Sequence, residues 1–152
     1  MLTMKGKYGL KAMLHLANMP DGERALSEEI ARANNISKKF LDTILADLRM
    51  AGMVHARKGR GGGYVLSRAP DDIRIGHILR VLEGPLAPIS CASRTAYRRC
   101  DDCRDEKTCA VRRIMLEVRN AISAVLDEKS LGDVLNAAEH EDAGLKEIMA
   151  SL

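Results

Sequence analysis

The sequence predicts a mainly α-helical fold with one small β-hairpin, and three observations support this prediction. Of the 152 residues, 46% are apolar but only 3% are aromatic, so the core must consist mostly of aliphatic side chains and methionine. Apolar residues recur at helical spacing along most of the chain. Only residues 54–67 show the pattern of two strands joined by a run of glycines.

The length of the chain suits one compact domain, or one domain with an appended arm, which needs no covalent cross-links. The N-terminus shows no cleavable signal pattern, and no apolar run approaches the roughly 18 residues that a membrane span needs. We therefore expect a cytoplasmic protein with no membrane partner. The net charge of +3 is small, but basic residues gather at Lys38-Lys39 and at residues 57–60.

The first half of the chain predicts three helices. Residues 5–19 carry apolar side chains at helical spacing, and Pro20-Asp21-Gly22 ends this first helix. A second helix is expected to begin at the cap Ser27 and to end at Asn34-Asn35. A third helix follows from the cap Ser37, and its apolar residues can pack against the second helix across a tight turn.

Two helices that meet at a tight turn form either a helix-turn-helix unit or a plain αα-hairpin. The next segment favours the helix-turn-helix, because predicted strands at 54–58 and 64–67 flank a glycine loop and would make a wing. This order is typical of winged-helix domains, whose second helix-turn-helix helix enters the major groove of DNA. The predicted DNA contacts are Ser37, Lys38, Lys39, Asp42 and Thr43 on that helix and Arg57, Lys58 and Arg60 in the wing.

The second half of the chain predicts a helix within residues 73–84, preceded by a short strand, and then a long amphipathic helix after Cys109. The long helix carries an apolar stripe that needs a cover, and we expect a second copy of the chain to supply it. A final helix, predicted from Ser130 to about His140, could fold back to help. The predicted dimerisation residues are Ile114, Met115, Val118, Ile122 and Val125.

All four cysteines lie within residues 91–109, in a polar segment that has little apolar reason to be ordered. Thiolates are soft ligands for iron–sulfur clusters, zinc or copper(I), and the neighbouring arginines would stabilise them. Only Cys100 and Cys103 make the Cys-x2-Cys pair that zinc sites usually contain twice. The spacing favours an iron–sulfur cluster, 2Fe–2S or 4Fe–4S, and leaves zinc or a thiol redox switch open. The predicted ligands are Cys91, Cys100, Cys103 and Cys109.

The sequence resembles the Rrf2-type winged-helix transcription regulators, which include iron–sulfur cluster, nitric-oxide and iron-responsive repressors. The resemblance covers nearly the whole chain and rests on "KGKYGLKAMLHLA", "GGGYVLS", "IGHILRVLEG", "SLGDVL" and the cysteine segment. It implies that Cys103 and Cys109 match the last two of the three cysteines that cluster-binding members typically carry. It also places the base-reading positions on Lys39, Asp42 and Thr43 and the wing arginine on Lys58.

The chain departs from the family pattern at the fourth ligand. Arg112 stands where some members have a histidine, and the N-terminal acidic ligand of other members falls near Lys7. Neither residue is a plausible ligand, whereas Cys91 and Cys100 are both present where one cysteine is usual. An all-cysteine site is therefore the expectation.

These observations predict a homodimeric DNA-binding repressor that senses iron, redox or nitric oxide status through the cluster and binds double-stranded DNA of approximate two-fold symmetry. The alternative is a winged-helix regulator whose cysteine loop binds zinc or switches by a disulfide. A thiol enzyme is not expected, because no βαβ context surrounds the Cys-x2-Cys pair. The expected organisation is a DNA-binding domain at 1–84, a cysteine loop at 85–109, dimerisation and C-terminal helices at 110–142 and a tail at 143–152.

Overall fold

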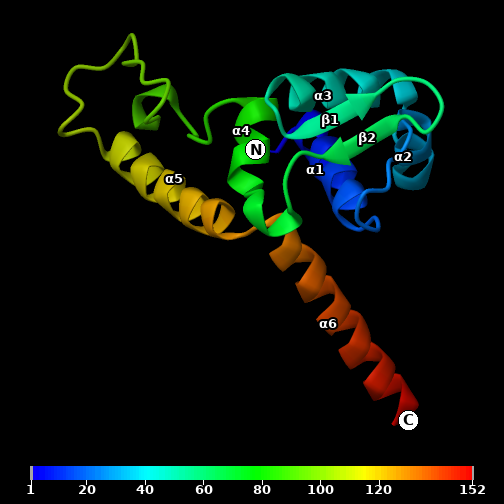
Figure 1. Ribbon diagram of the computed structural model, residues 1–152. Coiled ribbons are helices and arrows are strands. Elements are labelled where there is room, and N and C mark those ends of the chain that lie inside the picture. Colours follow the sequence, from blue (N-terminus) through cyan, green and yellow to red (C-terminus); the bar gives the residue numbers. More distant parts are fainter. Residues whose placement is uncertain (1, 152) are drawn as a thin grey trace.

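The computed structural model describes residues 2–151, with side chains except at residues 143–146 and 148. It is mainly helical and contains one two-stranded antiparallel sheet, which confirms the predicted fold class. Helices α1 to α4 and the sheet form one body, from which α5 and α6 extend in different directions (Figure 1). Among the described residues, no helix has both the length and the apolar character needed to cross a bilayer.

The N-terminal unit consists of α1 (Met4–Ala17), α2 (Ser27–Asn34) and α3 (Lys38–Met50). Asn35, with a φ of 54°, makes the left-handed turn between α2 and α3, and the Ser37 hydroxyl caps α3 by accepting from the Phe40 N–H. The helix-turn-helix prediction is therefore confirmed. Ser27, however, is the first residue of α2 and not its cap. Leu26 holds the cap position, and its N–H donates to the Glu29 carboxylate at 2.7 Å.

The wing is a hairpin of β1 (Val54–Arg57) and β2 (Gly63–Leu66) that is attached to the loop before α2. Tyr64 donates its N–H to the Ala25 carbonyl at 2.7 Å, and Ala25 donates back at 3.1 Å. Gly63 permits this approach, since it has a φ of 124° and a Cβ there would come within 2.6 Å of the Ala25 oxygen. The hydrogen bonds thus fix the base of the wing relative to the helix-turn-helix.

Two short turns and three helices complete the chain. The turn η1 (Pro70–Asp72) leads to α4 (Ile75–Glu83), and η2 (Ser90–Ala92) precedes α5 (Ala110–Glu128). The strand expected before α4 is only an isolated bridge between Arg74 and Ser130.

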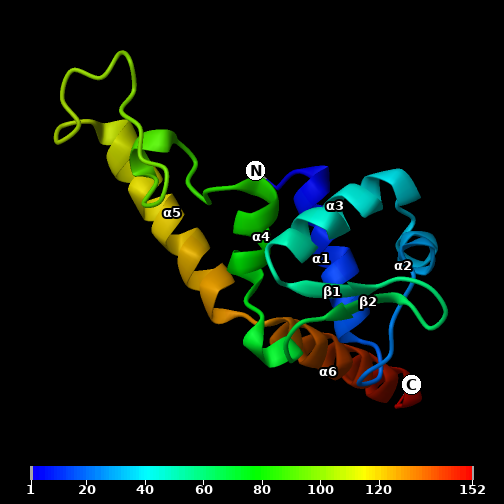
Figure 2. The ribbon, with the colours of Figure 1, turned by 45° about the horizontal axis from the view of Figure 1, so that its top comes forward.

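Helix α6 (Leu131–Ala150) differs from the sequence prediction in length and direction. The capping box at its start is confirmed, because Ser130 Oγ accepts from the Asp133 N–H at 3.0 Å and Asp133 accepts from the Ser130 N–H at 2.8 Å. The predicted end near His140 is wrong, and the expected tail is helical as far as Ala150. The prediction that this helix folds back over the long helix is also wrong, since its main contacts are with η1 and α1 and it points away from α5 (Figures 1 and 2).

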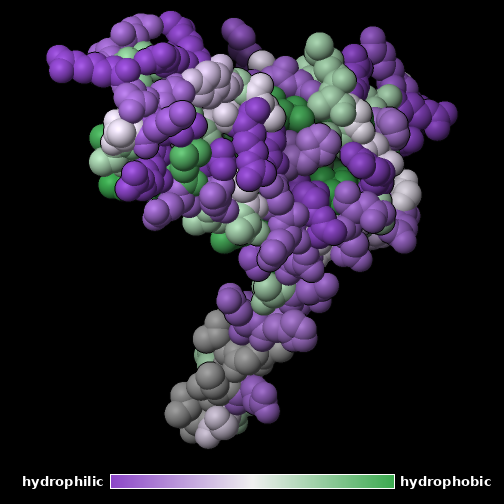
Figure 3. Space-filling view, turned by 90° about the vertical axis from the view of Figure 1, so that its left-hand side faces the viewer, coloured by the Kyte–Doolittle hydropathy of each residue, from purple (hydrophilic) through white to green (hydrophobic). Residues whose placement is uncertain are grey.

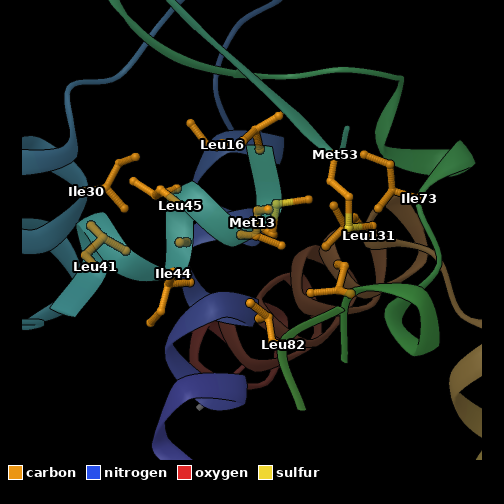
Figure 4. Packing of buried hydrophobic residues seen from close by; sticks show 14 of the residues in the cluster. Met13, Leu16, Ile30, Leu41, Ile44, Leu45, Met53, Ile73, Leu82 and Leu131 are labelled. Atoms are coloured by element: carbon orange, nitrogen blue, oxygen red, sulfur yellow. The ribbon is translucent and has the colours of Figure 1, made fainter. Parts of the chain in front are cut away.

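The core of the body is aliphatic and methionine-rich, as the composition predicts. Side chains from α1, α2 and α3 interlock with residues of the segments before β1 and α4 and with the start of α6 (Figure 4). Among the fully buried ones are Met13, Ile30, Leu41, Ile44, Leu45, Leu48, Met53, Ile73 and Leu131. Helix α4 also approaches α1 closely, because Gly9 leaves room for Leu82. The orientation of α3 is therefore set by packing on all of these elements.

Two residues of α3 test this account of the core. Leu45→Ala should lower the free energy of unfolding by about 2–5 kcal/mol, because it leaves a cavity at a fully buried position. Met50→Ala on the same helix should change it by less than about 0.5 kcal/mol, since Met50 is 84% exposed. Denaturant unfolding followed by circular dichroism measures both values, and equal losses would contradict the packing described.

Candidate nucleic-acid interface and cysteine loop

Helix α3 turns a polar face to solvent because its apolar stripe is buried in the core. Lys39 and Thr43 lie one turn apart on this exposed face, and the Thr43 hydroxyl donates to the Lys39 carbonyl at 3.3 Å. Neither side chain is held by an ion pair in the described part of the chain. Lys39 and Thr43, two of the three predicted base-reading residues, are therefore accessible to a DNA groove.

The other predicted residues of α3 are already engaged within the protein. Lys38 Nζ lies 2.8 Å from Asp42 Oδ2, and this hydrogen bond lowers the pKa of Asp42 and raises the pKa of Lys38. Ser27 further lowers the pKa of the Asp42 carboxyl through a side-chain hydrogen bond. Ser37 uses its hydroxyl as the helix cap. The Lys38 contact offsets a carboxylate that would otherwise repel DNA phosphates.

The wing places its basic residues next to α3. Arg57, Lys58 and Arg60 are all exposed. Arg57 and Lys58 line a shallow hollow together with Lys38 and Tyr64, so cations from the wing and the helix face the same space. The structure thus brings the two predicted groups of basic residues to one surface.

The cysteine loop is organised around Cys91, which lies in η2 with only 4% of its surface exposed. The thiol of Cys100 donates to the Cys91 sulfur, and the two sulfur atoms are 3.9 Å apart. This hydrogen bond is the main reason that the pKa of Cys100 is raised above its usual value. Cys103 and Cys109 are partly exposed. Within the described residues, no three His, Cys, Asp or Glu side chains converge in a way that could hold a metal ion.

Arginines of α5 attach the cysteine loop to that helix. Arg112 Nε donates to the Cys91 carbonyl at 3.1 Å, and Arg119 Nη1 donates to the Ala92 carbonyl at 2.8 Å. At the other end of the loop, the Cys109 sulfur caps α5 by accepting from the Arg112 N–H at 3.4 Å. Arg112, which stands where some Rrf2-type regulators have a histidine, therefore serves as an anchor for the loop.

The C-terminal half of α5 is attached to α4. Arg80 makes two hydrogen bonds to the Asp127 carboxylate, at 2.6 and 2.9 Å, and Arg74 donates to the Glu128 carbonyl at 2.8 Å. The Arg80 contact lowers the pKa of Asp127 and raises that of Arg80. Because α4 packs against α1 and α3, a continuous set of contacts joins the cysteine loop to the helix-turn-helix.

Sequence reasoning missed these arginine contacts. The one available signal was the seven-residue spacing of Arg112 and Arg119, which places both on one face of a helix. Arg80 and Asp127 are distant in sequence, so their pairing needed the fold.

The predicted dimerisation stripe is largely uncovered in the single chain. Helix α5, whose residues are all described, contains no buried residue. Ile114, Val118 and Val125 are exposed, together with the neighbouring Val111, whereas Met115 and Ile122 are half-buried. Viewed from the α5 side, hydrophobic patches lie between hydrophilic side chains (Figure 3). An apolar groove beside the stripe is lined by residues that include Leu79, Leu86, Val118, Ile122 and Leu126.

Comparisons with known proteins agree with this architecture. The Rrf2 family model, described as an iron-dependent transcriptional regulator, matches residues 2–137. An Rrf2-like HTH-type regulator of Rhodobacter capsulatus is 46% identical over 140 residues, which cover 90% of this chain and 93% of that protein. The HTH-type transcriptional regulator CymR of Bacillus subtilis is 34% identical over 140 residues, covering 92% and 93%.

Solved structures give the same result. The structure of CymR, the global cysteine regulator of B. subtilis, superposes with a TM-score of 0.75 at 35% identity, covering 90% of this chain and 97% of that one. T. potens IscR superposes with a TM-score of 0.74 at 31% identity, covering 93% and 90%. The residues 2–137 that the family model matches include the winged helix, the cysteine loop and α5. The chain belongs to the Rrf2 family of transcriptional regulators, whose members bind DNA and are not enzymes.

Proposed function

We propose that this chain is a homodimeric repressor that senses iron, redox or nitric oxide status through an iron–sulfur cluster in the cysteine loop. The observation that carries the proposal is the attachment of a four-thiol loop to α5, and of α5 to the DNA-binding body through α4. The relatives point to more than one signal, since one is named a global cysteine regulator and the family model is described as iron-dependent. The thiols of this chain favour the cluster.

The donor set fits a cluster in its chemistry. Cys91, Cys100, Cys103 and Cys109 would hold it after Cys103 and Cys109 move towards the Cys91–Cys100 pair, because no three of these thiols converge among the described residues. Thiolates are the usual ligands of iron–sulfur clusters. The sulfur atoms of Cys91 and Cys100 are 3.9 Å apart, close to the separation of about 3.8 Å expected for two thiolates at about 2.3 Å from one tetrahedral metal. When bound, the cluster would supply a charge and a redox state that respond to iron and oxidants.

The protein's own contacts would carry a change in the loop to the DNA-binding surface. A shift of the Cys91 backbone would move the carbonyls to which Arg112 and Arg119 donate, and α5 would move with these two arginines. The Arg80–Asp127 pair then transmits the displacement to α4, which packs on α3. A modest difference in the stability of two such arrangements is enough to change the fraction of molecules that bind DNA.

DNA would contact the exposed face of α3 and the wing together. Lys39 and Thr43 can reach base edges in the major groove, while Lys58 and Arg60 on a glycine-rich hairpin can reach phosphates or the minor groove. Asp42 contributes indirectly, because it is held by Lys38.

A second copy of the chain is the proposed cover for the exposed stripe of α5. Each apolar side chain buried there would contribute roughly 1.5–3 kcal/mol. A two-fold dimer would also present two recognition helices, which suits an operator with approximate two-fold symmetry.

The wing can be tested by salt dependence. Lys58→Ala with Arg60→Ala should weaken binding to all DNA sequences and reduce the slope of log K against log salt by roughly one unit per lost phosphate contact. Fluorescence anisotropy with a labelled duplex over a range of salt concentrations measures this slope. Arg113→Ala with Lys129→Ala is the matched control, since it removes two exposed positive charges from the α5 region. An unchanged slope in the wing variant would remove the wing from the interface.

The proposed dimer can be tested with substitutions on α5 in the full-length protein. Ile114→Glu with Val118→Glu should abolish the dimer, because charge replaces apolar surface at the centre of the stripe. Sedimentation velocity measures the association state. Asn120→Glu with Ala124→Glu adds two carboxylates to the exposed opposite face and should leave the dimer intact. A dimeric Ile114/Val118 variant would show that another surface joins the subunits.

The cluster can be tested by single replacements in anaerobically prepared protein. Cys103→Ser and Cys109→Ser should each abolish the visible absorption and the bound iron and sulfide, because a hydroxyl is a poor substitute for a thiolate. Cys91→Ser and Cys100→Ser should do the same if all four thiols ligate. Thr108→Ser is the control, since it keeps the hydroxyl that contacts Asp105 beside Cys109. A colourless protein with stoichiometric zinc would replace the cluster proposal with the zinc alternative.

A further inference from the structure

Two of the four thiols are already neighbours before any ligand binds. The sulfur atoms of Cys91 and Cys100 are 3.9 Å apart, with the Cys100 thiol directed at the Cys91 sulfur. A disulfide needs about 2.05 Å, so the sulfurs must approach each other by roughly 1.9 Å. Cys100 lies outside the helices and strands of the described chain, and its carbonyl accepts from the Cys103 N–H at 3.2 Å, so the approach requires rotation of the Cys100 side chain with a small shift of this turn.

The rest of the loop favours this pair over any other. The backbone at Cys91 is held by Arg112 and, through Ala92, by Arg119, so the Cys91 sulfur is a fixed target. The Cys109 sulfur is engaged as the cap of α5, where it accepts from the Arg112 N–H. The Cys103 backbone is held at two points, since its carbonyl accepts from Arg99 at 3.0 Å and its N–H donates to the Cys100 carbonyl at 3.2 Å. Cys100 is thus the thiol placed to move onto Cys91.

We propose that Cys91 and Cys100 form an intramolecular disulfide in the cluster-free protein, and that this bond withdraws two of the four thiols from metal binding. The inference deepens the proposed function, because it concerns how the same loop is regulated. The disulfide itself does not require that a cluster binds.

Burial sets the order of the chemical steps when the oxidant is a small-molecule disulfide such as oxidised glutathione. The Cys100 thiolate attacks one glutathione sulfur, forms a mixed disulfide and releases one glutathione. Cys91, too buried to meet the oxidant first, then attacks the Cys100 sulfur and releases the second glutathione. The two cysteines lose two electrons and two protons, and the oxidant leaves as two thiols.

Tryptic peptide mapping identifies the bond in full-length protein. Trypsin separates Cys91 in residues 81–94 from Cys100 and Cys103 in residues 100–104 and from Cys109 in residues 108–112. After anaerobic removal of iron and treatment with oxidised glutathione, a linked pair of peptides 81–94 and 100–104 is expected under non-reducing conditions. Cys103→Ser and Cys109→Ser should retain this linkage, whereas Cys100→Ser should lose it and leave Cys91 unmodified.

The order of steps gives a second signature. Cys91→Ser should accumulate glutathione on Cys100, because the resolving thiol is missing. Cys91→Ala is the companion variant if serine at this buried position disturbs folding, which circular dichroism would show. The assignment would be overturned if Cys103→Ser or Cys109→Ser lost the disulfide-linked peptides. It would also be overturned if the disulfide joined two chains on a non-reducing gel.

Cobalt(II) tests the consequence for metal binding without any cluster. The reduced protein should develop sulfur-to-cobalt charge-transfer absorption, and the oxidised protein should lose most of it and recover it after reduction. Equal cobalt binding by the reduced and oxidised proteins would contradict the claim that the disulfide removes Cys91 and Cys100 from metal binding. A protein that forms the disulfide yet never takes up iron and sulfide would instead contradict the proposed cluster and leave this inference standing.

Discussion

The structure depends on the attachment of α5 at both of its ends. Near its N-terminus, Arg112 and Arg119 hold carbonyls of η2, and near its C-terminus Asp127 holds Arg80 of α4. These contacts are partly exposed, so each stabilises the fold only modestly. Their importance is geometric, since α5 contributes no buried residue of its own. The position of α5 therefore depends on its contacts with both the cysteine loop and α4.

A movement of α5 can affect DNA binding only if α1 to α4 and the sheet move together as one rigid body. The core makes this possible, because α3 is packed into it along one face through aliphatic residues such as Leu41 and Ile44, which have no exposed surface. Close-packed interiors transmit small displacements and do not absorb them. The wing is joined to this rigid body by the two backbone hydrogen bonds between Ala25 and Tyr64. A movement of α4 would therefore shift α3 and the wing together.

The sequence was sufficient for features that depend on local chemistry. Ser37 as a cap, the glycine-rich wing and the Ser130–Asp133 capping box follow from residues within a few positions of one another. It failed where the outcome depends on long-range packing, as in the direction of α6, which joins η1 and α1 and does not return to α5. The Arg80–Asp127 pair was hidden for the same reason, and the Cys91–Cys100 contact was hidden because it depends on the path of an irregular loop. For the candidate site, residue types and spacing were predictable, and their partners were not.

The pairing of Cys91 with Cys100 gives the extra cysteine of this chain a physical role. A sulfur atom can be a metal ligand or half of a disulfide, but not both, so the two states of the loop exclude each other. The carbonyl of Cys91 is also the group that Arg112 holds, which means that either bond forms at the point where the loop is joined to α5. Iron supply and oxidant level would thus compete for the same sulfur atoms. The helix-turn-helix would respond to the outcome of that competition through a single set of contacts.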